Sequence, residues 1–312
     1  MRIVSFRLSR RDKDRLAGRL MRVLTSAVVL LVPLIAVALF LRAWPILVAK
    51  PVGELLFSTI WHPLKGSFGF YPFIMGTFWV TAVGMVIAVP PSLLTAIYLA
   101  EYASARIRAL AKPLIDLLAG IPSVVYGVWG TLIVVPLVGR YVAPTLKRWL
   151  GSLPLFGSDN PTGYGVLAGA VVLAVMVFPV IIAVAEEVIR GVPQGLREAS
   201  LALGATRWQT VRHVVLRRAW PGVIAAIVLA FSRAFGETMA VLMVVGNVTQ
   251  VPRSVFDAAY PLTALIANNY GEMMSVPLYD AALLGGALIL LLVILAFNVA
   301  SRLILVRLMR SE

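Results

Sequence analysis

An arginine and a glutamate within a long apolar stretch are the side chains best placed to do chemistry. Arg233 lies near the middle of a stretch that runs from about 220 to 245, and Glu237 follows four positions later. On a continuous helix, this spacing puts the two side chains on one face, where they can pair. A charge at mid-membrane depth costs roughly 2.5–3.5 kcal/mol on insertion scales, so such residues are functional candidates by default. Arg233 could offer its planar donors to an oxyanion with Glu237 orienting it, or the two could form a structural salt bridge.

Most catalytic and metal-binding chemistry lacks the residues it needs in this chain. There are no cysteines, and the two histidines, His62 and His213, lie far apart in the sequence. Disulfides, thiolate zinc sites and cysteine nucleophiles are therefore excluded, and no metal site is expected. No Gly-Lys dipeptide occurs, so there is no Walker A loop to hold a nucleotide. We predict that the chain is not an enzyme, binds no cofactor and relies on a partner for any ATP hydrolysis.

The elements that position these residues are predicted to be membrane-spanning helices. Hydrophobic residues make up 60% of the 312 residues and charged residues only 13%, against roughly 25% charged residues in an ordinary soluble domain. A spanning helix needs about 20 mostly apolar residues. Six stretches qualify and predict an all-α polytopic membrane protein: 24–41, 73–99, 114–138, 166–185, 223–245 and 281–305.

Prolines are expected to kink the second and third predicted spans. Pro90 and Pro91 fall in the second span and Pro122 in the third, where each removes a helical donor and clashes with the preceding turn. Ser123 follows the expected kink at Pro122. We expect Ser123 either to face a substrate pathway beside exposed N–H groups or to lie at a simple packing kink. Thr77, also within a predicted span, is more often expected to bond its own backbone than to line a pore.

The net charge of +14 has two interpretations. In a soluble protein it would suggest a nucleic-acid partner. Here 20 of the 28 Lys and Arg residues lie on one side of the six predicted spans and seven on the other. The positive-inside rule then places both termini in the cytoplasm, with loops 151–165 and 247–280 outside. We therefore expect contact with membrane lipid and none with nucleic acid.

The chain divides into a basic cytoplasmic arm, 1–22, and one transmembrane domain, 23–312. The first apolar stretch could be a signal peptide, but its long basic arm and the lack of a small-residue cleavage site favour an uncleaved anchor. The apolar run 262–267 is too short to span a membrane. It predicts a re-entrant or interfacial helix.

The cytoplasmic loop at about 188–218 carries the most specific pattern. Glu198, Ala199 and Ser200 are followed after three residues by Gly204, which permits a sharp turn before a second short helix near Thr206. By composition alone, this segment would be a basic amphipathic helix lying on lipid headgroups. Its spacing resembles the EAA loop of ABC importer permeases. The resemblance implies a coupling helix at these residues, which docks into a groove of a separate ATPase subunit.

Three further segments resemble the PstC type of phosphate permease. They are 66–77 (GSFGFYPFIMGT), 120–127 (GIPSVVYG) and 233–241 (RAFGETMAV). The resemblance implies a type I importer (MetI-like) core in the bacterial inner membrane that forms half of a phosphate pathway. It also implies a PstA-like sister permease, two PstB-like ATP-binding subunits and a PstS-like external phosphate-binding protein as partners. The expected pathway residues are Ser123, Arg233, Glu237 and Thr238.

Two alternative functions remain open. A permease of the same architecture for molybdate, sulfate or phosphonate would also use Arg233. A secondary transporter could use Arg233 and Glu237 as a proton or ion couple, although the EAA-like loop and the lack of an obvious inverted repeat disfavour it.

Overall fold

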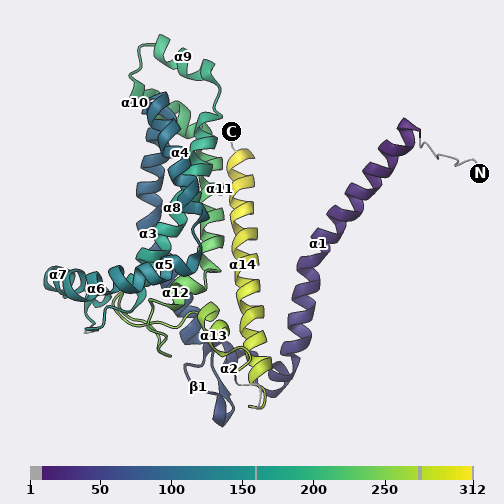
Figure 1. Cartoon of the computed structure of the whole chain (residues 1–312), viewed down its shortest axis with the longest axis vertical. Coiled ribbons are helices and arrows are strands. Elements are labelled where there is room, and N and C mark those ends of the chain that lie inside the picture. The colour runs from purple at the N-terminus through teal and green to yellow at the C-terminus, as the bar shows by residue number, and fades with distance from the viewer. Residues whose placement is uncertain (1–8, 159, 273–275, 311–312) are drawn as a thin grey trace, which may run out of the picture.

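A computed structural model describes residues 9–158, 160–272 and 276–310 of the chain. The described residues form a helical membrane-type fold with one short hairpin, which confirms the predicted all-α class (Figure 1). Within them, six helical segments are long and apolar enough to cross a membrane. These segments are Lys13–Ala49, Tyr71–Tyr102, Ser123–Leu150, Val166–Arg190, Arg207–Phe235 and Tyr279–Leu303.

The helices α3 (Tyr71–Ile97) and α8 (Val166–Arg190) form the centre of the bundle, and α11 (Leu216–Phe235) packs against both. Glycines allow the close approach. A Cβ on Gly84 of α3 would lie 3.3 Å from the Ala170 carbonyl oxygen of α8. Small residues at such contacts are typical of membrane helix pairs, because apolar lipid gives helices little hydrophobic reason to associate.

The first helix, α1 (Arg10–Ala49), leans away from the bundle (Figure 1). Its C-terminal part packs against α14 (Tyr279–Arg310), where Ala43 and Ile46 join the same buried cluster as Leu283. The rest of its apolar surface is exposed, as expected for a helix that contacts lipid or another subunit. The helix runs without a break through the basic segment from Arg10, so the division at residue 22 stays a prediction.

The third predicted span, 114–138, is wrong as a single helix. The structure ends α4 (Ala105–Gly120) before Pro122 and starts a new helix, α5 (Ser123–Trp129), directly after it. Pro122 lacks an N–H and disfavours a helical conformation in the residue before it, so the predicted kink is a full break. The chain then continues through four further helical segments: η3 (Gly130–Val134), α6 (Val135–Leu137), η4 (Val138–Val142) and α7 (Ala143–Leu150). By contrast, α3 continues through Pro90 and Pro91.

The fifth predicted span, 223–245, is also interrupted. The helix α11 ends at Phe235, Gly236 lies in its C-cap position, and the short helix α12 (Met239–Leu242) follows a turn. Gly236 and Thr238 have poor helix propensity, which favours a break at this point. Because the residues on both sides are apolar, the sequence predicted one continuous span and not this break.

One end of the bundle gathers the segments predicted to lie outside the membrane. Residues of 151–165 and 247–280 bond to each other, as in the 2.8 Å hydrogen bond from the Ser254 hydroxyl to the Leu155 carbonyl. The predicted short helix is confirmed as α13 (Leu262–Asn269). Its first N–H donates to the Thr77 hydroxyl, which itself donates to the Phe73 carbonyl, so Thr77 is a structural residue as expected. Other elements at this end are α2 (Val52–Phe57), β1 (Trp61–His62), η1 (Pro63–Lys65), β2 (Ser67–Phe68) and η5 (Pro154–Phe156).

The opposite end carries the loop that connects α8 to α11. This loop holds α9 (Gln194–Ala202), α10 (Arg207–Thr210) and the π-helical turn η6 (Val211–Val215). The beginning of α1 and the end of α14 lie toward the same end of the molecule (Figure 1). The loop and both ends of the described chain therefore share one side of the fold.

Candidate functional site

The loop at 188–218 folds as two short helices separated by a tight turn. Gly204 adopts a φ of +84°, a left-handed conformation that favours glycine. The second helix begins with a capping box in which the Thr206 hydroxyl accepts from the Gln209 N–H and the Gln209 side chain accepts from the Thr206 N–H. The predicted turn at Gly204 and the helix start near Thr206 are both confirmed.

The outer face of α9 is open. Glu198 and Ala199 are exposed, and Leu203 at its end is 90% exposed. An apolar side chain this exposed at the tip of a protein favours contact with another surface. Ser200 points the other way, because its hydroxyl lies 2.9 Å from the hydroxyl of the buried Thr210. Of the four predicted coupling residues, Glu198, Ala199 and Gly204 lie on the surface, and Ser200 closes the loop on itself.

An ion pair fixes α9 to the membrane bundle. The Arg197 Nη2 lies 2.7 Å from Glu101 Oε1, and both side chains are nearly buried, at 12% and 9% exposure. Glu101 belongs to η2 (Tyr98–Tyr102), the π-helical turn that ends α3. Arg197 also donates to the carbonyls of Ile189, at 2.9 Å, and Val192. These bonds satisfy most of the guanidinium donors, so the pair acts as a rigid anchor.

Sequence reasoning missed Glu101. The residue is an acid at the end of a span that faces a basic loop, which is a weak signal for an ion pair. Its partner lies 96 positions away, and local periodicity contains no information on that distance. Arg207 strengthens the same contact, since it donates to the Glu101 carbonyl and its guanidinium lies 4.7 Å from the centre of the Tyr102 ring.

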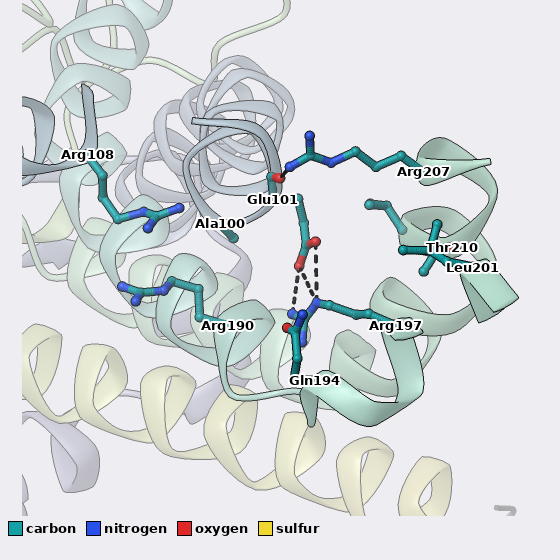
Figure 2. Close-up of a pocket in the computed structure, with 10 residues that line it drawn as sticks. Ala100, Glu101, Arg108, Arg190, Gln194, Arg197, Leu201, Arg207 and Thr210 are labelled. Atoms are coloured by element: carbon teal, nitrogen blue, oxygen red, sulfur yellow. Dashed lines mark hydrogen bonds and ion pairs between the residues drawn. The ribbon is translucent and has the colours of Figure 1, made fainter. Parts of the chain in front are cut away.

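A cavity of about 660 Å³ lies behind α9 (Figure 2). It opens between α9, α10, η2, α4 and the end of α8. Charged side chains dominate its lining. They are Glu101, Arg108, Arg190, Arg197 and Arg207.

The predicted pathway residues lie near the two breaks in the helices. Arg233 is in the last turn of α11, not at the middle of a span as expected. Glu237 and Thr238 form the link to α12, and Ser123 begins α5. The helix α5 packs on α12, where a Cβ on Gly127 would lie 3.2 Å from the Ala240 Cα. The breaks at Pro122 and Gly236 therefore bring these distant segments to one region.

The expected pairing of Arg233 with Glu237 is not formed within the part of the chain that the structure describes. The prediction assumed one continuous helix, and α11 ends between the two residues. The Glu237 carboxylate instead accepts from the Ala240 N–H at 3.3 Å, and its carbonyl accepts from the Thr263 hydroxyl at 2.9 Å. Arg233 is exposed on the chain surface and interacts electrostatically with Tyr126 of α5.

Comparison with known proteins places these features in a family. The profile described as "Binding-protein-dependent transport system inner membrane component" matches residues 92–310. The phosphate transport system permease protein PstC of Xylella fastidiosa (strain 9a5c) is 39% identical over 259 residues, which cover 82% of this chain and 79% of that protein. The same-named protein of Pasteurella multocida is 38% identical, with 82% of each chain covered. A probable ABC transporter permease of Bacillus subtilis, YqgH, is 36% identical over 87% of this chain and 84% of that protein.

A solved structure shares the fold. A chain of the MetNI methionine ABC transporter, in an inward-facing conformation, superimposes with a TM-score of 0.52 at 23% identity. The match covers 77% of this chain and 94% of that one. It supports the predicted MetI-like core.

These matches decide the class of the protein. The chain is a multi-pass inner-membrane component of an ABC importer, which works with an ATPase and a binding protein and is not itself catalytic. The alternative of a secondary transporter is excluded. The chain belongs to the family of binding-protein-dependent transport system inner membrane components, and within it to the PstC-type permeases.

Proposed function

We propose that this chain forms half of the translocation pathway of an ATP-driven phosphate importer, with α9 as the helix that receives the force of the ATPase. The observation that carries the coupling role is the geometry of α9, which has an open outer face and is fixed to α3 by the Arg197–Glu101 pair. Because α9 is fixed at this point, a force that the ATPase applies to its outer face would be passed on to α3. The names of the PstC relatives support phosphate as the substrate.

The partners follow from the same role. A PstA-like sister permease would supply the other half of the pathway, two PstB-like subunits would hydrolyse ATP, and a PstS-like protein would deliver phosphate. A sister subunit would complete the pathway, because lipid alone does not form a polar route for an anion.

Both termini and α9 would lie in the cytoplasm, with 151–165 and 247–280 outside. The asymmetry of Lys and Arg supports this topology. The beginning of α1 and the end of α14 also lie toward the same end of the molecule as α9, although α1 leans away from the bundle (Figure 1). The chain has no native cysteine, so Ser158→Cys gives a single label site. An impermeant maleimide should label this variant in intact cells, and labelling only after permeabilisation would contradict the topology.

Arg233 would contact phosphate at the pathway, beside α5. Its exposure on the isolated chain supports this role, since a pathway residue faces the space between two subunits. Glu237 would act differently from the sequence prediction. Through its bonds to Ala240 and Thr263, it would hold α12 and α13 in place around the pathway, while Ser123 and Thr238 supply hydroxyls nearby.

Reconstitution tests the function itself. Vesicles that contain the chain, its sister permease, the ATPase and the binding protein should take up radioactive phosphate only with ATP. Excess unlabelled molybdate, sulfate or phosphonate should compete poorly. Uptake of one of these oxyanions with no uptake of phosphate would mean that the substrate is wrong, while the importer class would stand.

Arg233→Gln should abolish phosphate uptake while the complex still assembles. Arg233→Lys should restore little uptake, because an ammonium group is a point charge without the bidentate fork. Arg42→Gln removes one exposed charge from α1 and should leave uptake close to that of the parent protein. Substantial uptake by Arg233→Gln would remove Arg233 from the pathway.

Gly204→Ala should weaken the coupling of ATP hydrolysis to transport. A side chain in the left-handed conformation of Gly204 costs roughly 1–2 kcal/mol. Gly195→Ala on α9 adds the same methyl group in ordinary helical backbone with no atom within 4 Å, so it is the matched control. We expect uptake per ATP hydrolysed to fall severalfold for Gly204→Ala alone, and equal values for both variants would contradict the need for this turn.

Glu101→Leu should loosen α9 from the bundle. The change leaves Arg197 nearly buried without its carboxylate, and breaking such a pair typically costs about 3–5 kcal/mol. Amide hydrogen exchange of α9 in the assembled complex should accelerate, and the double variant Glu101→Leu with Arg197→Met should recover part of the protection. The exposed Glu187→Leu is the control. Unchanged exchange in Glu101→Leu would show that the pair does not anchor α9.

A further inference from the structure

The side chains around the cavity behind α9 carry more positive charge than the neighbouring carboxylates neutralise. Four arginines line it, and Glu101 is the one carboxylate among its described lining residues. Arg197 neutralises Glu101 at 2.7 Å. Among the described residues, Arg108 and Arg207 form no ion pair with a carboxylate, so these two guanidinium groups are in excess. Like charges that gather around one cavity repel each other unless an anion or water compensates them.

The excess guanidinium groups are held in place by acceptors that do not neutralise them. Arg108 donates to the carbonyls of Leu99, at 2.9 Å, and Ala103, at 3.3 Å. Arg207 donates to the Glu101 carbonyl and covers the Tyr102 ring. These contacts restrict each side chain before a ligand arrives, which lowers the entropy cost of binding.

Arg190 is the exception, because it contacts an acid. Its Nη1 lies 3.2 Å from Glu186 Oε1, and its side chain remains 47% exposed. Glu186 does not line this cavity. A guanidinium has five N–H donors, so this contact leaves Arg190 donors for a ligand.

Figure 2 shows how these groups surround the space. Arg108 and Arg190 occupy one side of the view, Arg197 and Arg207 the other, and the Glu101 carboxylate turns toward Arg197. Gln194 lies at the near edge and adds an amide. A tetrahedral oxyanion with several acceptor oxygens matches donors that converge from different directions, and arginine forks suit phosphate better than lysine does.

We propose that this cavity binds a phosphate group, from either free inorganic phosphate or the headgroup of an anionic phospholipid. The site differs from the translocation pathway, because its residues lie at the α9 end of the bundle, whereas Arg233 ends α11 near the opposite segments. The bound group bridges α9 and α10 to α4 and α8. Its occupancy therefore strengthens the attachment of α9 that the Arg197–Glu101 pair begins. The effect on coupling rests on the proposed function, whereas binding itself does not.

The test measures binding to the purified complex by two probes. Radioactive inorganic phosphate is titrated onto the complex in delipidated detergent solution. Separately, the complex is equilibrated with phosphatidylglycerol in mixed micelles, and retained lipid is counted by native mass spectrometry. The test variant is Arg190→Gln with Arg207→Gln, which spares Arg197 and the turn that Arg108 holds. The matched control is Arg212→Gln with Arg217→Gln, which removes two exposed charges of the same loop that do not line the cavity.

We expect the affinity of the complex for one of the two probes to fall by roughly tenfold or more in the test variant and to stay unchanged in the control. Loss of inorganic phosphate binding identifies the free anion as the ligand, and loss of retained phosphatidylglycerol alone identifies the headgroup. Equal binding of both probes by the parent, test and control proteins overturns the proposal. Because neither assay needs transport, this failure is distinct from a failure of phosphate uptake.

Discussion

The ion pair between Arg197 and Glu101 is the contact on which the loop end of the molecule depends. It joins a helix of nine residues, too short to be stable in water, to the end of a long membrane helix. The pair is nearly buried and most of the guanidinium donors are hydrogen-bonded, so its geometry is restricted. Together with the contact between the Ser200 and Thr210 hydroxyls, the pair orients the open face of α9, so that a force on α9 would reach the bundle.

A second constraint acts inside the membrane domain, where two helices are broken. Pro122 separates α4 from α5 and Gly236 follows α11, so each break lies where a candidate membrane span begins or ends. Irregular backbone at membrane depth is tolerated only where protein or a water-filled space surrounds it. At the second break, the polar groups of Glu237 are satisfied, because its carboxylate and its carbonyl both accept hydrogen bonds from neighbouring segments. The breaks thus create a polar region without leaving it unsupported.

The sequence predicted the features that depend on composition or local spacing. The number of spans, a short helix at 262–267 and the turn at Gly204 follow from apolar run length or from the demands of one residue on its backbone, although the third span was placed wrongly. The break after Phe235 was missed, because apolar residues on both sides of the Gly-Glu-Thr segment read as one stretch. The predicted Arg233–Glu237 pair was wrong for the same reason, because it assumed a continuous helix. Glu101 and the arginine cavity depend on contacts between residues 96 to 106 positions apart, which no local pattern reports.

The most direct test of α9 as the coupling helix is cross-linking from single cysteines to the ATPase in the assembled importer. Ala199→Cys and Leu203→Cys place the thiol on the open face, whereas Thr210→Cys places it in the buried interior of the same loop. We expect both open-face variants to cross-link to the ATPase, with yields that change when ATP is bound, and Thr210→Cys not to react. Cross-linking of neither open-face position to the ATPase in an active complex would contradict the assignment of α9 as the contact that drives transport.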